Sequence, residues 1–327
     1  MKRYADPQAV EQQLRKIQQE ISPNEARTNL FNLVVYVSDH DDRLLIEALN
    51  YLHGKRPTRV IVIRRNHGGV THTDVTARCV PDENDKVLCI QEIVIFSGDD
   101  KAGEVPETWA PLLIREIPVF VWWLDKLDAA PVPQFFDDFA DRCFVDSGFS
   151  DKPFEFFESL SSRLPILKTP LSDFAWVRLA PLMKVTANFF NPQEMREKLA
   201  DVSKVHLEGA EAAEALLFFQ WLRTKMDWKG PTFPEGQLWR LLSNNQPVEL
   251  LHTSQAPLDK GFSLTFETRQ GEKLSLKDTG EGFVVARGSE NMEYTSIFRL
   301  PSMGEALLQE VDKNASDRLY YEALENW

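Results

Sequence analysis

The chain has 327 residues, of which 43% are hydrophobic, and a formal net charge of −13. This length predicts two domains or one large domain with an appendage, and the hydrophobic content excludes a disordered chain. The acidic balance argues against a nucleic-acid-binding protein, because such proteins need a basic surface to displace counterions from the phosphate backbone.

Residues 1–168 show the alternating pattern of an α/β domain. Helices are predicted where apolar residues recur three or four positions apart, at residues 7–21, 44–52, 105–116, 133–140 and 153–164. Buried strands are predicted where apolar residues run without interruption, at residues 30–37, 58–65, 117–124 and 142–146. Residues 70–80 and 87–96 flank a turn-rich segment and are expected to form an antiparallel hairpin. The fold class is therefore α/β, with a mixed, mostly parallel sheet flanked by helices.

The strand predicted at residues 117–124 is expected at the centre of this sheet. Pro118 fits the start of a strand, where a missing N–H costs little. Side chains alternate along a strand, so Trp122 and Trp123 must point to opposite faces of the sheet. We expect both rings to contribute mainly to packing, and Asp125 to lie just past the carboxyl end, where α/β proteins place functional loops.

A proline-containing linker over residues 164–170 precedes a second domain, residues 169–327. Helices are predicted at residues 171–190 and 210–228, and a final helix at residues 306–319. A strand is predicted at residues 202–207. Residues 261–300 alternate between apolar and polar side chains and contain glycine-rich turns, which predicts an antiparallel meander. We therefore expect a second α+β domain with an antiparallel meander.

Targeting signals are missing from the sequence pattern. Lys2 and Arg3 are not followed by an apolar segment, so no secretory signal peptide is expected, and no apolar run is long enough for a membrane span. The three cysteines include no Cys-x-x-Cys spacing, which favours a reducing compartment. We expect a cytoplasmic protein that binds neither membranes nor nucleic acid.

The motifs of common enzymes are also missing. The loop after the first strand is acidic, whereas a dinucleotide would need the glycines of G-x-G-x-x-G, and no Walker loop, G-x-S-x-G or H-E-x-x-H is found. His67, His72 and Asp74 could be considered metal ligands, but no fourth strong ligand lies nearby, which favours a solvated loop. We predict no catalytic residue, no metal and no cofactor.

One group of polar residues lies at the predicted carboxyl ends of the parallel strands, which meet at one edge of a sheet. Its members are Arg64, Arg65, Asp125, Asp146 and Ser147, and Arg178 on the next long helix is expected to approach them. Arginine forks beside a serine hydroxyl could hold a phosphate or carboxylate, such as a sugar phosphate. The alternative, which we favour, is a network of Arg–Asp pairs that locks the loops.

Five segments resemble a known family in sequence and in order. They are residues 26–35, 56–63, 117–123, 141–147 and 173–179. The chain resembles the OpcA-type glucose-6-phosphate dehydrogenase assembly proteins, most clearly over residues 26–190. The Trp-Trp strand and the Asp-x-x-Trp-x-Arg segment that contains Trp176 and Arg178 are the most specific parts. The family often has a further tryptophan after this arginine, where this chain has Leu182 and Met183.

The resemblance implies a non-enzymatic cytosolic protein that binds glucose-6-phosphate dehydrogenase and favours its assembly and activity in the oxidative pentose phosphate pathway. The candidate contact residues are Arg64, Arg65, Trp122, Trp123, Asp125, Asp146, Ser147, Trp176 and Arg178. The alternative from a different class is a sugar-phosphate sensor or enzyme that uses Arg64, Ser147 and Arg178.

The predicted hairpin also suggests a redox pair. If its loop is centred on Asn84, Cys79 and Cys89 fall opposite each other. Directly opposed residues have Cα atoms about 4.5–5.5 Å apart, inside the range that a disulfide tolerates. Two reduced thiols are the favoured state in a reducing cytosol, and Cys143 is expected to be a packing residue.

Overall fold

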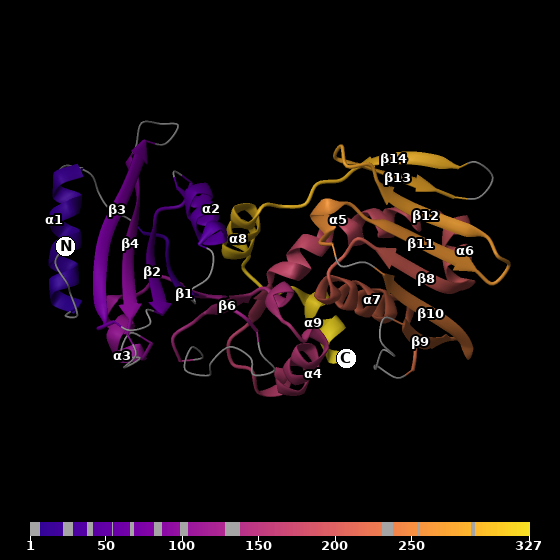
Figure 1. Cartoon of the computed structure of the whole chain (residues 1–327), viewed down its shortest axis with the longest axis horizontal. Coiled ribbons are helices and arrows are strands. Elements are labelled where there is room, and N and C mark those ends of the chain that lie inside the picture. Colours follow the sequence, from indigo (N-terminus) through magenta and orange to yellow (C-terminus); the bar gives the residue numbers. More distant parts are fainter. Residues whose placement is uncertain are drawn as a thin grey trace. The chain divides into compact units, whose positions relative to one another are not determined.

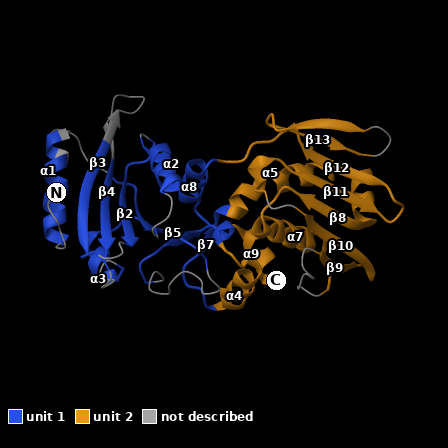
Figure 2. Cartoon of the chain, in the orientation of Figure 1, with its two compact units in different colours: residues 1–149, 166–174, 302–316 blue, residues 150–165, 175–301, 317–327 orange. Residues whose placement is uncertain are grey.

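The structure is a computed structural model that describes residues 7–21, 29–37, 42–53, 55–65, 69–81, 87–98, 104–127, 138–230, 238–253, 256–288 and 292–327. The chain forms two compact units (Figure 2). The first comprises residues 1–149, 166–174 and 302–316, and the second comprises residues 150–165, 175–301 and 317–327. The chain therefore passes between the units several times instead of dividing once near residue 168.

The first unit contains a seven-stranded sheet with the order β3-β4-β2-β1-β5-β6-β7 (Figure 1). Its strands are β1 (Phe31–Val37), β2 (Thr58–Arg65), β3 (His72–Pro81), β4 (Val87–Ser97), β5 (Val119–Leu124), β6 (Arg142–Val145) and β7 (Leu171–Asp173). Only the β3–β4 pair is antiparallel among the pairings of these strands. The predicted mixed, mostly parallel sheet is confirmed, with β1 at its centre and β5, the strand expected there, directly beside it.

Helices of the first unit are α1 (Pro7–Ile21), α2 (Arg43–Leu52), α3 (Pro106–Trp109) and α8 (Met303–Asp312). The helix predicted at residues 105–116 is wrong in length. It ends at Trp109 and continues as a single 3-10 turn over Ala110–Leu112, where Pro111 lacks the N–H that an α-helix needs. The helix predicted at residues 133–140 lies mostly outside the described residues.

The second unit contains another seven-stranded sheet, with the order β14-β13-β12-β11-β8-β10-β9. Its strands are β8 (Val202–Glu208), β9 (Leu238–Ser243), β10 (Gln246–Thr253), β11 (Ser263–Thr268), β12 (Lys273–Asp278), β13 (Phe283–Arg287) and β14 (Glu293–Ile297). The predicted meander, β11 to β14, is confirmed, because each strand pairs antiparallel with the next. The β9–β10 hairpin was missed, although its turn residues Asn244 and Asn245 have the positive φ angles of a tight hairpin turn.

Helices associated with the second unit are α4 (Pro153–Arg163), α5 (Phe174–Phe189), α6 (Gln193–Ala200), α7 (Ala212–Met226) and α9 (Arg318–Glu325). The single final helix that was predicted is wrong, because the chain forms α8 and α9 with a break between them. Asp317 begins α9 as a separate helix, because its carboxylate caps the amino end by accepting the N–H groups of Leu319 and Tyr320. No helix among the described residues combines the length and apolarity that a membrane crossing requires.

Candidate functional site

The carboxyl ends of β1, β2 and β5 meet at one edge of the first sheet. Val37 at the end of β1 is in register with Arg64 on one side and with Leu124 on the other. Arg64, Arg65 and Asp125 therefore lie at this edge, as the parallel arrangement predicts. Asp125 is half-buried, and its carboxylate accepts the backbone N–H of Lys126 at 2.7 Å.

The two tryptophans of β5 point to opposite faces and have different surroundings. Trp122 is 0% exposed and packs edge-to-face on Phe174, with ring centroids 5.6 Å apart. Trp123 is half-buried and stacks on Tyr36 with a centroid distance of 4.3 Å and an interplanar angle of 2°. Its indole N–H donates to the backbone oxygen of Lys126 at 3.3 Å. Trp122 is thus a core residue, and Trp123 retains a partly exposed surface.

A second layer supports Trp123. The guanidinium of Arg65 donates to the hydroxyl of Tyr36 at 2.6 Å and forms an ion pair with Glu104 at 3.2 Å. Burial, followed by the nearby Glu104 carboxylate, raises the pKa of Tyr36 to about 12. We call Tyr36, Arg65, Glu104 and Trp123 the tryptophan shelf. Sequence reasoning missed Tyr36 and Glu104, although Tyr36 could have been found by aligning the ends of β1 and β5.

The charged residues of the edge hold one another. Arg64 forms an ion pair with Asp42 at 2.7 Å, just before α2, while Arg65 holds Glu104. Both arginines are therefore bound to carboxylates of the same unit, which agrees with the loop-locking alternative. Asp42 occupies the N-cap position of α2 but makes no side-chain cap there.

Asp146 and Ser147 are enclosed in the turn that follows β6. Their exposed fractions are 2% and 0%. The Asp146 carboxylate accepts the N–H of Gly148 at 3.0 Å, and the N–H of Ser147 donates to Asp173 at 3.0 Å. These carboxylates organise the backbone of the turn, and neither side chain of the pair is open to a solute.

Trp176 and Arg178 belong to the second unit, so neither unit brings Arg178 together with Arg64 and Ser147. Trp176 is 3% exposed, and its indole N–H donates to Asp317 at 3.2 Å. The Arg178 guanidinium lies 3.5 Å from the carboxylate of Glu214, which is 1% exposed. Both residues of this segment therefore make structural contacts inside their own unit.

The remaining predicted residues concern metals and thiols. His72 stacks on Phe96 with centroids 4.6 Å apart, and its Nδ1 lies 3.1 Å from the backbone oxygen of Val70. His67 lies outside the described residues. Among the described residues, no group of three or more histidine, cysteine, aspartate or glutamate side chains could hold a metal ion. The register of β3 and β4 pairs Cys79 with Cys89, which confirms the predicted alignment but leaves their redox activity a prediction.

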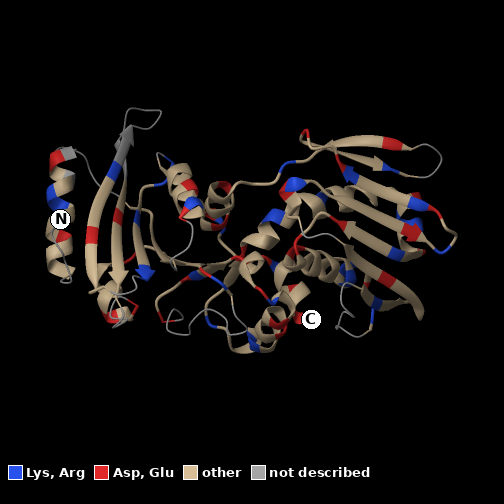
Figure 3. Cartoon of the chain, in the orientation of Figure 1, with Lys and Arg blue, Asp and Glu red and all other residues tan. Residues whose placement is uncertain are grey.

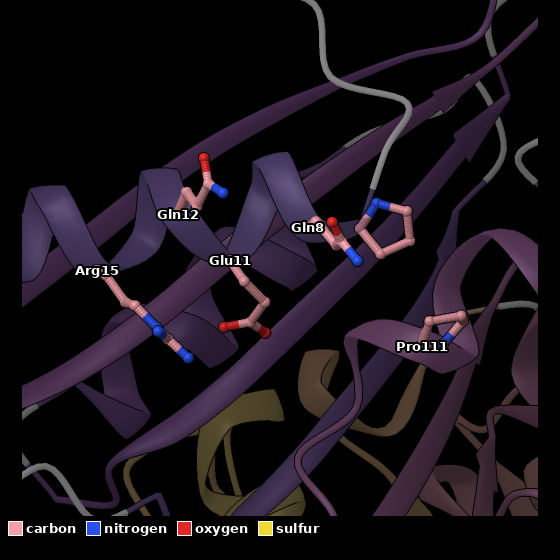
Figure 4. Close-up of a pocket in the computed structure, with 6 residues that line it drawn as sticks. Gln8, Glu11, Gln12, Arg15 and Pro111 are labelled. Carbon is pink, nitrogen blue, oxygen red and sulfur yellow. The ribbon is translucent and has the colours of Figure 1, made fainter.

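An open hollow of about 650 Å³ lies on the first unit, beside α1 (Figure 4). It is lined by Pro7, Gln8, Glu11, Gln12, Arg15 and Pro111. Glu11 is bound to Arg59, whose guanidinium also donates to Gln91 and to the backbone oxygen of Leu112. Because Arg59 is the second residue of β2, the hollow lies near the amino end of that strand, away from the tryptophan shelf.

Comparisons with known proteins cover most of the chain. A family model described as the glucose-6-phosphate dehydrogenase subunit N-terminal domain matches residues 50–162, and its C-terminal counterpart matches residues 169–324. A protein of Nostoc punctiforme named "Putative OxPP cycle protein OpcA" is 31% identical over 188 residues, 54% of this chain and 39% of that protein. The protein of the same name from Synechococcus elongatus is 27% identical over 151 residues, 44% of this chain and 33% of that protein.

The matched segments thus span well under half the length of these curated relatives. Among solved structures, an oxidoreductase from Sinorhizobium meliloti aligns with a TM-score of 0.42 and 9% identity, covering 92% of this chain and 86% of that one.

Proposed function

Because this chain belongs to the OpcA family of glucose-6-phosphate dehydrogenase subunits, we propose that it is a non-catalytic assembly factor and activator of that dehydrogenase. Its relatives are named for the OxPP cycle, the oxidative pentose phosphate pathway, so we also place it in that pathway and in the cytoplasm. The function proposed is binding to an enzyme, with no reaction carried out by the chain itself.

The observation that carries this proposal is the state of the carboxyl edge of the first sheet. In α/β enzymes this edge binds the substrate or cofactor. Here Arg64 and Arg65 are held by Asp42 and Glu104. The same pairs weaken the sugar-phosphate alternative, because a phosphate would have to displace carboxylates that already neutralise these arginines.

The tryptophan shelf offers a surface suited to a protein partner. Trp123 is half-buried, and Tyr36 and Arg65 fix the orientation of its ring from behind. Tryptophan, tyrosine and arginine are the residues that most often dominate the free energy of protein–protein binding. A rigid ring also loses little conformational entropy when a partner covers it. We therefore propose that the shelf is a contact site for the dehydrogenase.

Activation would arise from a shift between conformational or oligomeric states of the dehydrogenase. A partner shifts such an equilibrium only by its difference in affinity for the two states. A tenfold to hundredfold activation requires about 1.4–2.7 kcal/mol of differential binding. An interface of ordinary size supplies this through a few anchoring side chains.

The test is a titration of purified dehydrogenase with this chain, following substrate saturation and the mass of the complex by light scattering. We expect a change in apparent substrate affinity, maximal rate or assembly state, weakened by salt because the chain is strongly acidic. If none of these quantities changes at saturating concentration, the activator proposal fails. Separate calorimetry with glucose 6-phosphate and the chain alone tests the sugar-phosphate alternative.

A further inference from the structure

The sheet of the second unit has one covered and one open face. Aromatic residues from the helical layer pack on one side. Phe190, directly after α5, lies 4.8 Å from Phe266, and Phe219 of α7 lies 5.5 Å from Trp239, measured between ring centroids. Side chains that alternate with these core residues point to the other face, where strands β8 to β14 present half-buried or exposed residues. Figure 3 shows basic and acidic residues interspersed over these strands.

Five of these charges form a row across the open face. The strand registers pair Arg240 with Glu249, Glu249 with Lys204, Lys204 with Glu267, and Glu267 with Lys273. Directly paired residues of neighbouring strands lie on the same face. The row therefore alternates in sign across β9, β10, β8, β11 and β12, and we call it the charge ladder.

A neutral strip runs beside the charge ladder. The same registers align Leu238, Leu251, His206, Thr265 and Ser275, two residues further along each strand. All five are half-buried, since their neighbours partly cover them. The strip holds no lysine, arginine or carboxylate, and the centre of an interface is likewise depleted of charged residues.

The charge of this face differs from that of the whole chain. The chain carries a net charge of −13, which opposes the approach of a second copy. The charge ladder has three basic and two acidic residues, so a copy approaching this face meets no excess of negative charge. A row of alternating sign is also complementary to itself when it is displaced by one strand.

We propose that two copies of this chain associate through the open faces of their second sheets. A two-fold axis parallel to the strands, between β8 and β11, places Lys204 opposite Glu267 of the second copy, and Lys273 opposite Glu249 of the second copy. Because the axis preserves the position along the strands, each of these contacts occurs twice. The neutral strips face each other at the same time, with Thr265 opposite His206 of the second copy.

The proposal makes a specific prediction about charge reversal. Lys204→Glu places glutamates opposite each other in a pair of identical copies, and Glu267→Lys places lysines opposite each other. When the two variants are mixed, each contact again joins a glutamate to a lysine. We expect each variant alone to associate at least tenfold more weakly than the unaltered chain, and the mixture to form heterodimers.

The measurement is analytical ultracentrifugation of the whole chain between about 1 and 200 μM, with differently labelled variants for the mixture. Lys152→Glu is the matched control, because it makes the same charge change on the exposed residue that immediately precedes α4, in the same unit. It should leave association unchanged, and circular dichroism verifies that all variants are folded.

Three results would overturn the proposal. One is an unaltered chain that remains monomeric at every concentration, and another is a mixture that associates no better than either variant alone. The third is normal self-association of Lys204→Glu combined with lost binding to the dehydrogenase, which would assign the open face to that partner instead.

Discussion

The adjacent tryptophans of β5 are expected to have different roles, Trp122 in the stability of the fold and Trp123 in binding the dehydrogenase. Trp122→Ala removes a ring that is 0% exposed, so it should lower the free energy of unfolding by about 3–5 kcal/mol. Trp123→Ala should leave the fold intact and weaken binding to the dehydrogenase at least tenfold, if the shelf is an anchor. Chemical unfolding and the activation titration separate the two effects. Equal binding by Trp123→Ala and the unaltered chain would exclude the shelf as a contact site.

Two tyrosines are expected to ionise at a higher pH than a tyrosine in the unfolded chain. Burial, and for Tyr36 also Glu104, raises the pKa of Tyr36 and of Tyr294 to about 12. An unfolded tyrosine has a pKa of about 10, so the folded chain binds more protons between pH 10 and 12. Their stabilising effect is therefore complete below pH 10 and is lost as the pH rises from 10 to 12.

Absorbance at the phenolate band tests this expectation. In a fast pH jump to about 11, Tyr36 and Tyr294 should remain protonated until the chain unfolds. Tyr36→Phe should remove one phenolate from the absorbance change that accompanies unfolding, which identifies Tyr36. A single transition of all six tyrosines near pH 10 in the folded chain would contradict the assignment.

For single residues, the sequence predicted which face of the sheet a side chain occupies better than it predicted which side chains contact it. The two-residue period of a strand was sufficient to place Trp122 and Trp123 on opposite faces. The ring that stacks on Trp123 comes from β1, and the carboxylate that holds Arg65 comes from Glu104, beyond the end of β4. Such contacts depend on the strand order and on loop paths, which no local period contains.

The antiparallel strands β3 and β4 place Cys79 directly opposite Cys89. Mild oxidation is expected to join them, because directly opposed residues meet the distance that a disulfide requires. Closing so short a loop should stabilise the hairpin by roughly 3 kcal/mol. Mass spectrometry of unreduced peptides should show the bridge, and Cys143, which is buried, serves as the internal control. Two unbridged thiols after oxidation would refute the pairing.

Helices and strands with a clear pattern of apolar residues were predicted well. Those whose conformation depends on a neighbouring element in the fold were not. The strand predicted at residues 58–65 is β2 (Thr58–Arg65). By contrast, Leu171–Asp173 reads as the first turn of a helix but forms β7, because β6 offers it a parallel partner. Local propensity is a weak guide where a neighbouring strand supplies the hydrogen bonds.

Within the whole molecule, a segment distant in sequence completes the first unit. The N–H of Met303 in α8 donates to Glu47 at 3.2 Å, and Arg56 forms an ion pair with Asp312 at 2.8 Å. The buried Arg142 donates to the backbone oxygen of Glu310 at 2.8 Å. Sequence reasoning assigned this helix to the second domain, since nothing in its own pattern identifies the surface that it covers.

A fragment of residues 1–174 should therefore be unstable, because it uncovers the side of α2 where Tyr51 packs against Gly304, and leaves Arg142 without its acceptor. Joining residues 302–316 to the fragment by a flexible linker should restore cooperative thermal unfolding. The control is the same linker with the sequence of that segment scrambled. Equal melting temperatures for the fragment with and without the segment would show that α8 is dispensable.

The position of α8 also has a consequence for protein synthesis. The 256 residues between Glu47 and Met303 take roughly 13–50 s to translate at about 5–20 residues per second. Throughout that interval the nascent chain lacks the helix that packs on Glu47 and Tyr51 of α2, and after residue 173 every strand of the first sheet has been translated. Chaperones should therefore have access to this side of α2 during elongation, and the first unit should not complete its folding before residues 303–312 emerge.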